Sequence, residues 1–214
     1  MKIIKPSFLI ETPLDGEHIL KQIEKAGRTA YKTEDKITTD SAKKFIRKIL
    51  DIGHESVIEH YSITVRVICD RGITHEIVRH RLASYTQEST RYCNYSKGKF
   101  GGEITVIKPH FWNSSQDNDK KKYELWEKIM GKAENAYLAL IKLGASPEEA
   151  RSVLPNSLKT EIVMTMNLRE WRHFFKLRTS KDAHPQMREI ARPLLDEFKR
   201  QIPVIFDDIV YKKE

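Results

Sequence analysis

Residues 79–92 read R-H-R-L-A-S-Y-T-Q-E-S-T-R-Y and combine three arginines with only two aliphatic residues, Leu82 and Ala83. Such a segment can bury little apolar surface, so core packing alone does not account for it. Its guanidinium and hydroxyl groups are suited to binding phosphate or carboxylate groups. Because charge runs usually face water, two interpretations stand at this point: a solvated basic loop and an anion-binding segment.

The segments on either side of residues 79–92 predict both strands and helices. Residues 61–69 and 158–166 alternate between apolar and polar side chains, which is typical of half-buried strands. Asp70-Arg71-Gly72 predicts a turn, followed by a short helix from about Thr74 that leads into the arginine stretch. Apolar residues at helical spacing predict longer helices over residues 15–31, 41–52, 123–143 and 167–178, and a last helix from His184 that Pro193 kinks or divides.

Within the predicted helix over residues 167–178, the arginines and His173 are expected on the exposed surface. The chain has no internal repeat and no low-complexity linker, so it predicts one α+β domain over residues 1–214. No apolar run reaches the ~20 residues that a membrane span requires. The N-terminus does not resemble a secretory signal, and two cysteines do not make a disulfide framework, so a cytoplasmic location is expected.

The net charge of +8 suggests an anionic partner. The lysines are scattered, and no helix-turn-helix, zinc-finger or RNP pattern is present. A small anionic molecule bound by clustered arginines explains the charge as well as a nucleic acid does, and composition does not choose between them. A basic RNA- or DNA-binding module is therefore the rival hypothesis from another functional class.

Three familiar chemistries lack their sequence signatures. The histidines of H-E-S-V-I-E-H at residues 54–60 are six apart, and Ile58 stands where the second ligand of an H-E-x-x-H zinc site belongs, so no metal is predicted. No G-x-S-x-G motif is present, and Ser89, near Glu88 and Arg91, is interpreted as a hydrogen-bonding residue. Without a G-x-G-x-x-G or Walker loop, arginines and helix ends would have to hold any nucleotide.

Arg79-His80-Arg81, followed by Ser89 and then Arg91-Tyr92, resembles the signature of the flavin-dependent thymidylate synthases. Further segments over most of the chain resemble motifs of that family and occur in the family's order. They are G-H-E-S-V-I-E-H at 53–60, A-R-S-V-L-P at 150–155, N-L-R-E-W-R-H-F-F-K-L-R at 167–178 and A-H-P-Q at 183–186.

The resemblance implies an enzyme that methylates dUMP to dTMP, with methylenetetrahydrofolate as carbon donor, FAD as hydride carrier and NADPH as reductant. It also implies a homotetramer with active sites at subunit interfaces, no nucleic-acid or membrane partner, and an α+β fold whose mostly antiparallel sheet is flanked by helices. The other thymidylate synthases attack the uracil with a cysteine that follows a proline. Neither Cys69 nor Cys93 follows one, which agrees with a flavin mechanism that needs no cysteine nucleophile.

The resemblance also assigns residues to ligands. Arg178 is the predicted catalytic residue, which would bind the uracil and stabilise its N3-deprotonated or enolate-like form. Two positions depart from the family pattern: Glu76 stands where many members have glutamine, and His173 where some have asparagine. The predicted FAD-binding residues are Ser56, Glu59, Arg79, His80, Arg81, Gln87, Asn167, Leu168, Arg169 and His173. The predicted dUMP-binding residues are Glu76, Ile77, Val78, Arg79, Gln87, Glu88, Ser89, Thr90, Arg91, Arg151 and Arg178.

Overall fold

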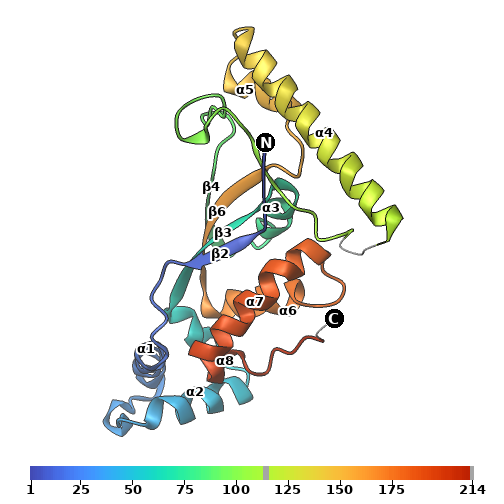
Figure 1. Ribbon diagram of the computed structural model, residues 1–214. Coiled ribbons are helices and arrows are strands. Elements are labelled where there is room, and N and C mark those ends of the chain that lie inside the picture. The colour runs from blue at the N-terminus through green and yellow to red at the C-terminus, as the bar shows by residue number, and fades with distance from the viewer. Residues whose placement is uncertain (113–115, 213–214) are drawn as a thin grey trace. The chain divides into compact units, whose positions relative to one another are not determined.

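A computed structural model of the chain describes residues 1–112 and 116–212 (Figure 1). Contacts between residues that are close in space divide the chain into two compact units. The first unit comprises Met1–Ser7, Val67–Arg79 and Thr86–Ile162, and the second unit comprises Phe8–Arg66, His80–Tyr85 and Val163–Glu214. Among the described residues, no helix combines the length and the apolar character that crossing a membrane requires.

The main sheet has four strands in the order β2, β3, β6, β4. Leu168 N donates a hydrogen bond to Tyr61 O at 3.0 Å, and Arg71 N donates to Leu158 O at 3.1 Å. The residue number falls along one strand as it rises along the other, so β3 and β6 are antiparallel, as predicted for most of the sheet. The strands span Ser7–Ile10 (β2), Ser62–Asp70 (β3), Ala83–Gln87 (β4) and Lys159–Asn167 (β6).

The side chains of β3 and β6 confirm the predicted alternation. Every second residue of β3 is buried from Ile63 onward, and β6 follows the same pattern from Thr160 to Met166. A period of two in burial is expected when one face of a sheet packs against helices and the other is partly exposed. The two predicted strands are thus the central pair of the sheet.

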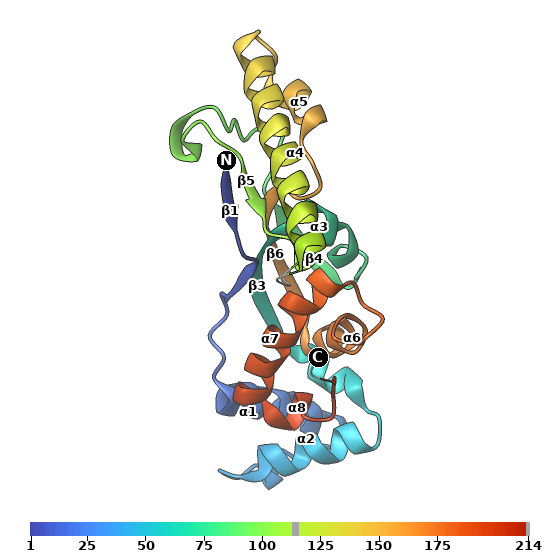
Figure 2. The ribbon, with the colours of Figure 1, turned by 45° about the vertical axis from the view of Figure 1, so that its right-hand side comes forward.

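In the second unit, α1 packs against α2 and the 3-10 helix η3, while α6 contacts η3 and α7 (Figure 2). Short 3-10 turns at Thr29–Tyr31 and Glu34–Lys36 follow α1. The helices of this unit span Gly16–Arg28 (α1), Ser41–Asp51 (α2), Glu55–His60 (η3), Leu168–Arg178 (α6), Pro185–Gln201 (α7) and Pro203–Phe206 (α8).

Aromatic side chains form the core of the second unit. Trp171, Phe174 and Phe175 of α6 are at most 1% exposed and pack against one another. Phe198 contacts Trp171 and Phe175, and Phe206 contacts Phe175 and Phe198, with all ring centroids in the cluster 5.1 to 5.8 Å apart. Most of these pairs are edge-to-face or tilted, the arrangement that the ring quadrupoles favour. The helix α6 is therefore fixed by its apolar side.

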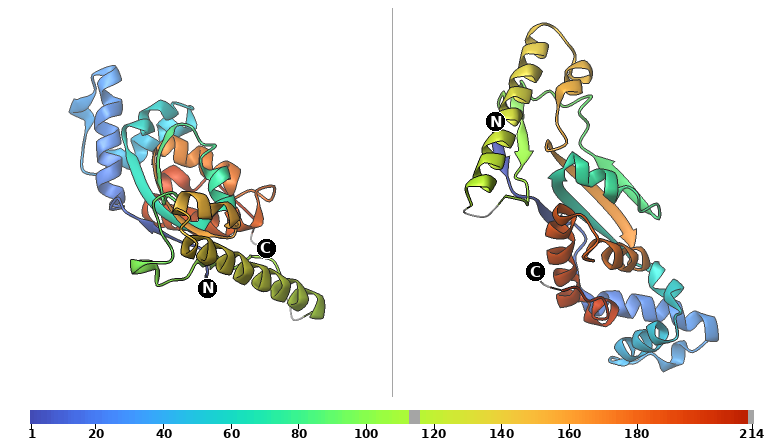
Figure 3. Two further views of the ribbon diagram at one scale, coloured as in Figure 1. Left: turned by 90° about the horizontal axis from the view of Figure 1, so that it is seen from above. Right: turned by 90° about the vertical axis from the view of Figure 1, so that its right-hand side faces the viewer.

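In the first unit, a separate core lies under the long helix α4. β1 pairs in parallel with β5, and α4 runs alongside this pair, with α5 beside it (Figure 3). Buried Tyr95, Val106, Met130 and Tyr137 belong to this core. The elements span Lys2–Ile4 (β1), Arg71–Ile77 (α3), Gly98–Phe100 (η4), Thr105–Ile107 (β5), Asp117–Lys142 (α4), Pro147–Ala150 (α5) and Arg151–Val153 (η5).

One local prediction is wrong, and one of the two outcomes expected at Pro193 is excluded. No separate turn follows β3, because Asp70 caps α3 directly: its Oδ1 accepts a hydrogen bond from Ile73 N at 2.9 Å, so the helix begins at Arg71 rather than near Thr74. Pro193 does not divide the last long helix, which is continuous as α7. The strand β4 lies inside the polar stretch 79–92, whose lack of aliphatic residues hid it from the sequence pattern.

The glycines Gly27 and Gly131 both lie inside helices but in different surroundings. A Cβ at Gly27 would lie 2.7 Å from Val57 Cγ1 and 2.8 Å from Phe45 Cε1, whereas nothing lies within 4 Å of a Cβ at Gly131. Gly27→Ala should therefore cost about 1–3 kcal/mol through overpacking. Gly131→Ala should stabilise by up to about 1 kcal/mol through helix propensity. Urea unfolding measures both changes, and a stabilised Gly27 variant would contradict this packing of α1.

Candidate functional site

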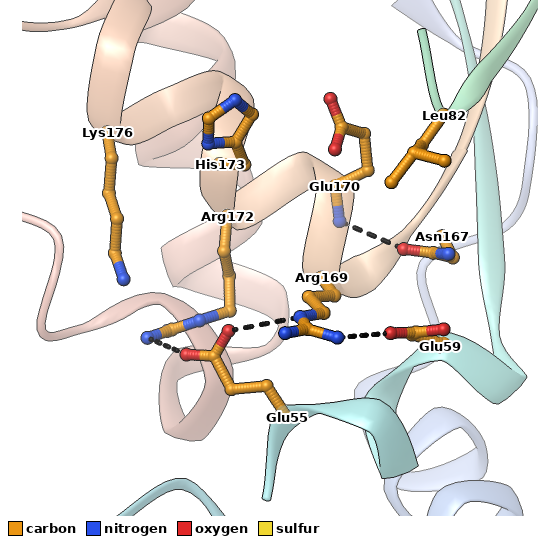
Figure 4. Close-up of a pocket in the computed structure, with 9 residues that line it drawn as sticks. All are labelled: Glu55, Glu59, Leu82, Asn167, Arg169, Glu170, Arg172, His173 and Lys176. Atoms are coloured by element: carbon orange, nitrogen blue, oxygen red, sulfur yellow. Dashed lines mark hydrogen bonds and ion pairs between the residues drawn. The ribbon is translucent and has the colours of Figure 1, made fainter. Parts of the chain in front are cut away.

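A cavity of about 510 Å³ opens in the second unit beside the start of α6. Its wall is built by η3, by the end of β6 and the first turns of α6, and by Leu82 (Figure 4). Four of the residues that line it, Glu59, Asn167, Arg169 and His173, are predicted flavin-binding residues. The fold thus gathers side chains that are more than one hundred positions apart in the sequence.

The local sequence explains why α6 begins at the cavity. Asn167 is the last residue of β6 and also the N-cap of α6, where its Oδ1 accepts a hydrogen bond from Glu170 N at 2.9 Å. Asparagine is among the preferred N-cap residues because its short side chain satisfies a backbone N–H of the first turn. Strand and helix therefore meet without a loop, and Arg169 and His173 face the cavity (Figure 4).

Two arginines of α6 differ in their environment. Arg169 is 53% exposed and pairs with Glu59 at 2.7 Å. Arg172 is 4% exposed and pairs with Glu55 at 3.3 Å and with both carboxylate oxygens of Asp208 at 2.6 and 2.7 Å. The Arg172 guanidinium lowers the pKa of the Asp208 carboxyl.

The expectation that the arginines of residues 167–178 all lie on the surface is therefore wrong for Arg172. Burying a guanidinium is costly unless it is paired and hydrogen-bonded. Asp208 supplies a bidentate partner from beyond the last long helix, and the Ile205 carbonyl oxygen accepts a further hydrogen bond from Arg172. Helical periodicity carries no information about partners so far along the chain, which is why sequence reasoning missed this cluster.

A second chain of polar contacts connects three residues of the second unit. His80 Nδ1 lies 3.0 Å from Glu170 Oε1, and Arg178 Nε donates a hydrogen bond to His80 Nε2 at 3.0 Å. His80 and Glu170 are buried, at 4% and 7% exposure, whereas Arg178 at the end of α6 is half-buried. Burial lowers the pKa of His80, and the Arg178 charge lowers it further, against the opposing effect of Glu170.

His80 and Glu170 also belong to a group of possible metal ligands. One ligand atom each of His80, Glu170 and His173 lies within 4.8 Å of the others. His80 Nε2, however, accepts a hydrogen bond from the permanent cation of Arg178, and His80 Nδ1 is next to Glu170. A metal ion bound here would meet a guanidinium in contact with one of its ligands, so the donor set favours a hydrogen-bonded chain over a cation site.

The first unit orders the second half of the stretch 79–92 through side-chain contacts. Gln87 Nε2 donates to Thr74 Oγ1 at 3.1 Å and to Thr160 Oγ1 at 3.3 Å. Lys159 Nζ pairs with Glu88 at 2.9 Å, and Tyr95 OH donates to the same carboxylate at 3.1 Å. The solvated basic loop is therefore the wrong interpretation for Gln87 to Thr90, whereas Arg91 and Tyr92 are exposed.

Two arginines of the first unit also contact their neighbours. Arg151 Nη1 donates to Thr90 Oγ1 at 3.4 Å, and exposed Arg91 pairs with Glu148 at 3.0 Å. The two units divide the predicted site residues between them. The second unit contains Ser56, Glu59, His80, Arg81, Asn167, Leu168, Arg169, His173 and Arg178, and the first contains Glu76, Ile77, Val78, Arg79, Gln87, Glu88, Ser89, Thr90, Arg91 and Arg151.

Known proteins are similar in sequence to this chain over most of its length. A family model described as "Thymidylate synthase complementing protein" matches residues 14–204. A flavin-dependent thymidylate synthase from Pyrococcus furiosus is 38% identical over 82% of this chain and 70% of its own length. The chain belongs to the flavin-dependent thymidylate synthase family. A member from Geobacter sulfurreducens is 37% identical over 81% of this chain and 72% of its own length. A member from Mycobacterium tuberculosis is 34% identical over 92% of this chain and 81% of its own length.

Solved structures share the fold. A UMP/dUMP methylase, PolB from Streptomyces cacaoi, bound with 5-Br dUMP, superimposes with a TM-score of 0.80 over 97% of this chain and 96% of its own. The same methylase bound with 5-Br UMP gives a TM-score of 0.78. The sequences are 20% identical, so this similarity concerns the fold alone, and it confirms the predicted α+β class.

The lowered pKa of His80 predicts a pH dependence of stability. In the unfolded chain His80 takes up a proton near pH 6.5, whereas in the folded chain it does so only at lower pH. Protonation therefore favours the unfolded state. The stability contributed by neutral His80 is complete above pH 6.5 and is lost as the pH falls. Native protein should therefore lose more stability than His80→Gln between about pH 7.5 and about pH 5.5. Urea titrations at both pH values measure the difference, and identical losses would contradict a buried neutral His80.

Proposed function

We propose that this chain catalyses the reductive methylation of dUMP to dTMP. The observation that carries the proposal is the convergence of four predicted flavin-binding residues on one cavity, in a member of the flavin-dependent thymidylate synthase family. FAD is the proposed hydride carrier, methylenetetrahydrofolate the carbon donor and NADPH the reductant.

The side chains around the cavity suit a flavin dinucleotide. Arg169 is half exposed, so its guanidinium can exchange Glu59 for a pyrophosphate oxygen without a new burial cost. Asn167 contributes an amide and His173 an imidazole, both of which can donate or accept hydrogen bonds. When bound, FAD supplies the hydride that completes the methyl group, and the protein's own residues bind and orient the reactants.

The residues Gln87–Arg91 and Arg151 are proposed to bind dUMP. Guanidinium groups and a serine hydroxyl are donors suited to the substrate phosphate. The Glu88 carboxylate is already paired with Lys159 at 2.9 Å, which limits its repulsion of that phosphate. Arg178 is proposed to hold the uracil ring, because a permanent cation placed where negative charge develops lowers the barrier electrostatically.

The two cysteines fit a mechanism without an enzyme thiolate. Cys69 lies in β3 with 1% exposure, and burial raises the pKa of its thiol far above the usual range. A buried neutral thiol is a poor nucleophile, because the thiolate is the reactive form. Cys93 follows Tyr92 rather than a proline. The methyl transfer is therefore proposed to depend on the flavin and on Arg178.

Residues 1–214 are proposed to form a single domain. The chain passes between its two units five times, at residues 7–8, 66–67, 79–80, 85–86 and 162–163, so no single linker separates them. The family resemblance supports a homotetramer with active sites at subunit interfaces. Two free cysteines and no disulfide are in keeping with a cytoplasmic location.

Absorption spectroscopy tests the proposed function most directly. Purified protein, reconstituted with FAD if necessary, should show a flavin spectrum that bleaches with NADPH under anaerobic conditions and should convert dUMP to dTMP with methylenetetrahydrofolate. A colourless protein that does not take up FAD would refute the proposal. Steeply salt-dependent binding of long polyanions by such a protein would instead favour the nucleic-acid-binding hypothesis.

Replacing Arg178 with alanine tests the catalytic role. Arg178→Ala should lower kcat for dTMP formation by about 100-fold or more while FAD stays bound, because one preorganised donor to the developing charge is lost. Arg200→Ala is the matched control, since this arginine is 67% exposed and pairs with Glu197 of the same helix. Unchanged turnover in Arg178→Ala would contradict the assignment.

A further inference from the structure

We propose that Glu170 and His80 are positioning residues that fix the orientation of the Arg178 guanidinium for its work on dUMP. The inference rests on the proposed function, because it presupposes the catalytic role of Arg178. It concerns the contacts Glu170 Oε1 to His80 Nδ1 and His80 Nε2 to Arg178 Nε, both 3.0 Å long.

The hydrogen bonds that connect Glu170, His80 and Arg178 allow only one arrangement of protons. Arginine Nε carries a hydrogen and cannot accept, so His80 Nε2 must be the acceptor in its bond with Arg178. The neutral imidazole then carries its proton on Nδ1, which donates to the Glu170 carboxylate. Glu170 thereby selects the histidine tautomer that can receive Arg178.

The surroundings of His80 hold the imidazole in place. Tyr85 OH donates to the His80 carbonyl oxygen at 2.7 Å. The rings of Phe174 and His173 contact the imidazole edge-on, with centroids 5.0 and 5.4 Å away. The backbone of Glu170 is also held, because its N–H donates a hydrogen bond to Asn167 Oδ1, the N-cap of α6. A rigid acceptor can therefore transmit its orientation to Arg178.

The hydrogen bond from Arg178 Nε to His80 constrains the orientation of the guanidinium plane. A fixed plane is what recognition of a planar base requires. The Nε–H bond lies in the plane of the guanidinium group, so an acceptor at a fixed place restrains rotation of that plane. A cation that is already oriented loses less entropy when the uracil binds and needs no reorganisation as charge develops. His80 thus acts on the reaction through Arg178.

Protonation of His80 would destroy this arrangement. A hydrogen on Nε2 would point at Arg178 Nε–H, replacing an acceptor with a second donor and placing two cations in contact. The ionisable groups that face His80 are Glu170, His173 and Arg178 from α6, with Tyr85 from β4. Of these, the carboxylate favours the proton and the Arg178 and His173 charges oppose it.

Two substitutions of His80 separate the two contacts. In His80→Gln the side-chain oxygen reaches the position of Nε2 and can still accept from Arg178, whereas His80→Asn reaches only the position of Nδ1 and keeps the Glu170 contact. We expect kcat and dUMP affinity to fall about 100-fold in His80→Asn, because the guanidinium loses its orientation. His80→Gln should remain within about tenfold of native protein. FAD content is measured in both variants, because His80 is also a predicted FAD-binding residue.

Glu170→Gln provides a second test with little change of shape. An amide can also donate to Nδ1 and select the wrong tautomer, so weaker dUMP binding is expected, measured by calorimetry independently of turnover. Glu24→Gln is the matched control: Glu24 is 1% exposed and pairs with Arg28 at 2.6 Å in α1, and its replacement should leave kcat and dUMP affinity unchanged.

Several results would overturn the inference while the native protein still forms dTMP. These are equal kcat in the Asn and Gln variants, an Asn variant more active than the Gln variant, or loss of FAD from both, which would assign the ring to flavin binding. If the His80 variants do not fold, native dUMP affinity in Glu170→Gln would overturn it. If native protein forms no dTMP, the proposed function and this inference fail together.

Discussion

The direct change from strand to helix at Asn167 is the constraint on which the candidate site depends. β6 is held by its antiparallel pairing with β3, and the same asparagine that ends the strand caps α6. A cap contributes only about 1 kcal/mol. Its larger consequence is geometric, because a helix that starts without a loop has a fixed rotation about its axis. That rotation buries Trp171 and Phe175 and leaves Arg169 and His173 at the cavity.

The three arginines of α6 show how one residue type serves different purposes. Arg172 is buried, and its pairing with Glu55 and Asp208 offsets a desolvation cost of several kcal/mol. Such a cluster specifies where the C-terminal segment lies more than it adds stability. Arg169 is half exposed and pairs with Glu59 at 2.7 Å and with Glu55 at 3.8 Å, contacts that an anionic ligand can replace. Arg178 donates a hydrogen bond to a neutral histidine, and this contact orients its guanidinium.

The unreactive thiol of Cys69 and the neutral imidazole of His80 have a common physical basis. Burial penalises the charged form of any ionisable group, so Cys69 stays a thiol and His80 stays an imidazole. A buried thiol is thereby lost to nucleophilic chemistry. A buried imidazole instead gains an unprotonated nitrogen that can receive a cation, and the same desolvation therefore inactivates one group and makes the other useful.

The sequence by itself determined the family, the two central strands and the long helices. It also supplied the residues that are predicted to bind FAD and dUMP. Residue spacing carries this information, because strands and helices have fixed periods and a family signature is a linear pattern. Sequence patterns missed β4, because a strand of polar residues lacks the apolar alternation that marks one. The buried Arg172 was also missed, because its partners Glu55 and Asp208 lie far away on either side of it in the chain. Only the tertiary structure brought Glu59 beside Arg169 and His80 between Glu170 and Arg178, since the distances between such groups are set by packing and not by sequence separation.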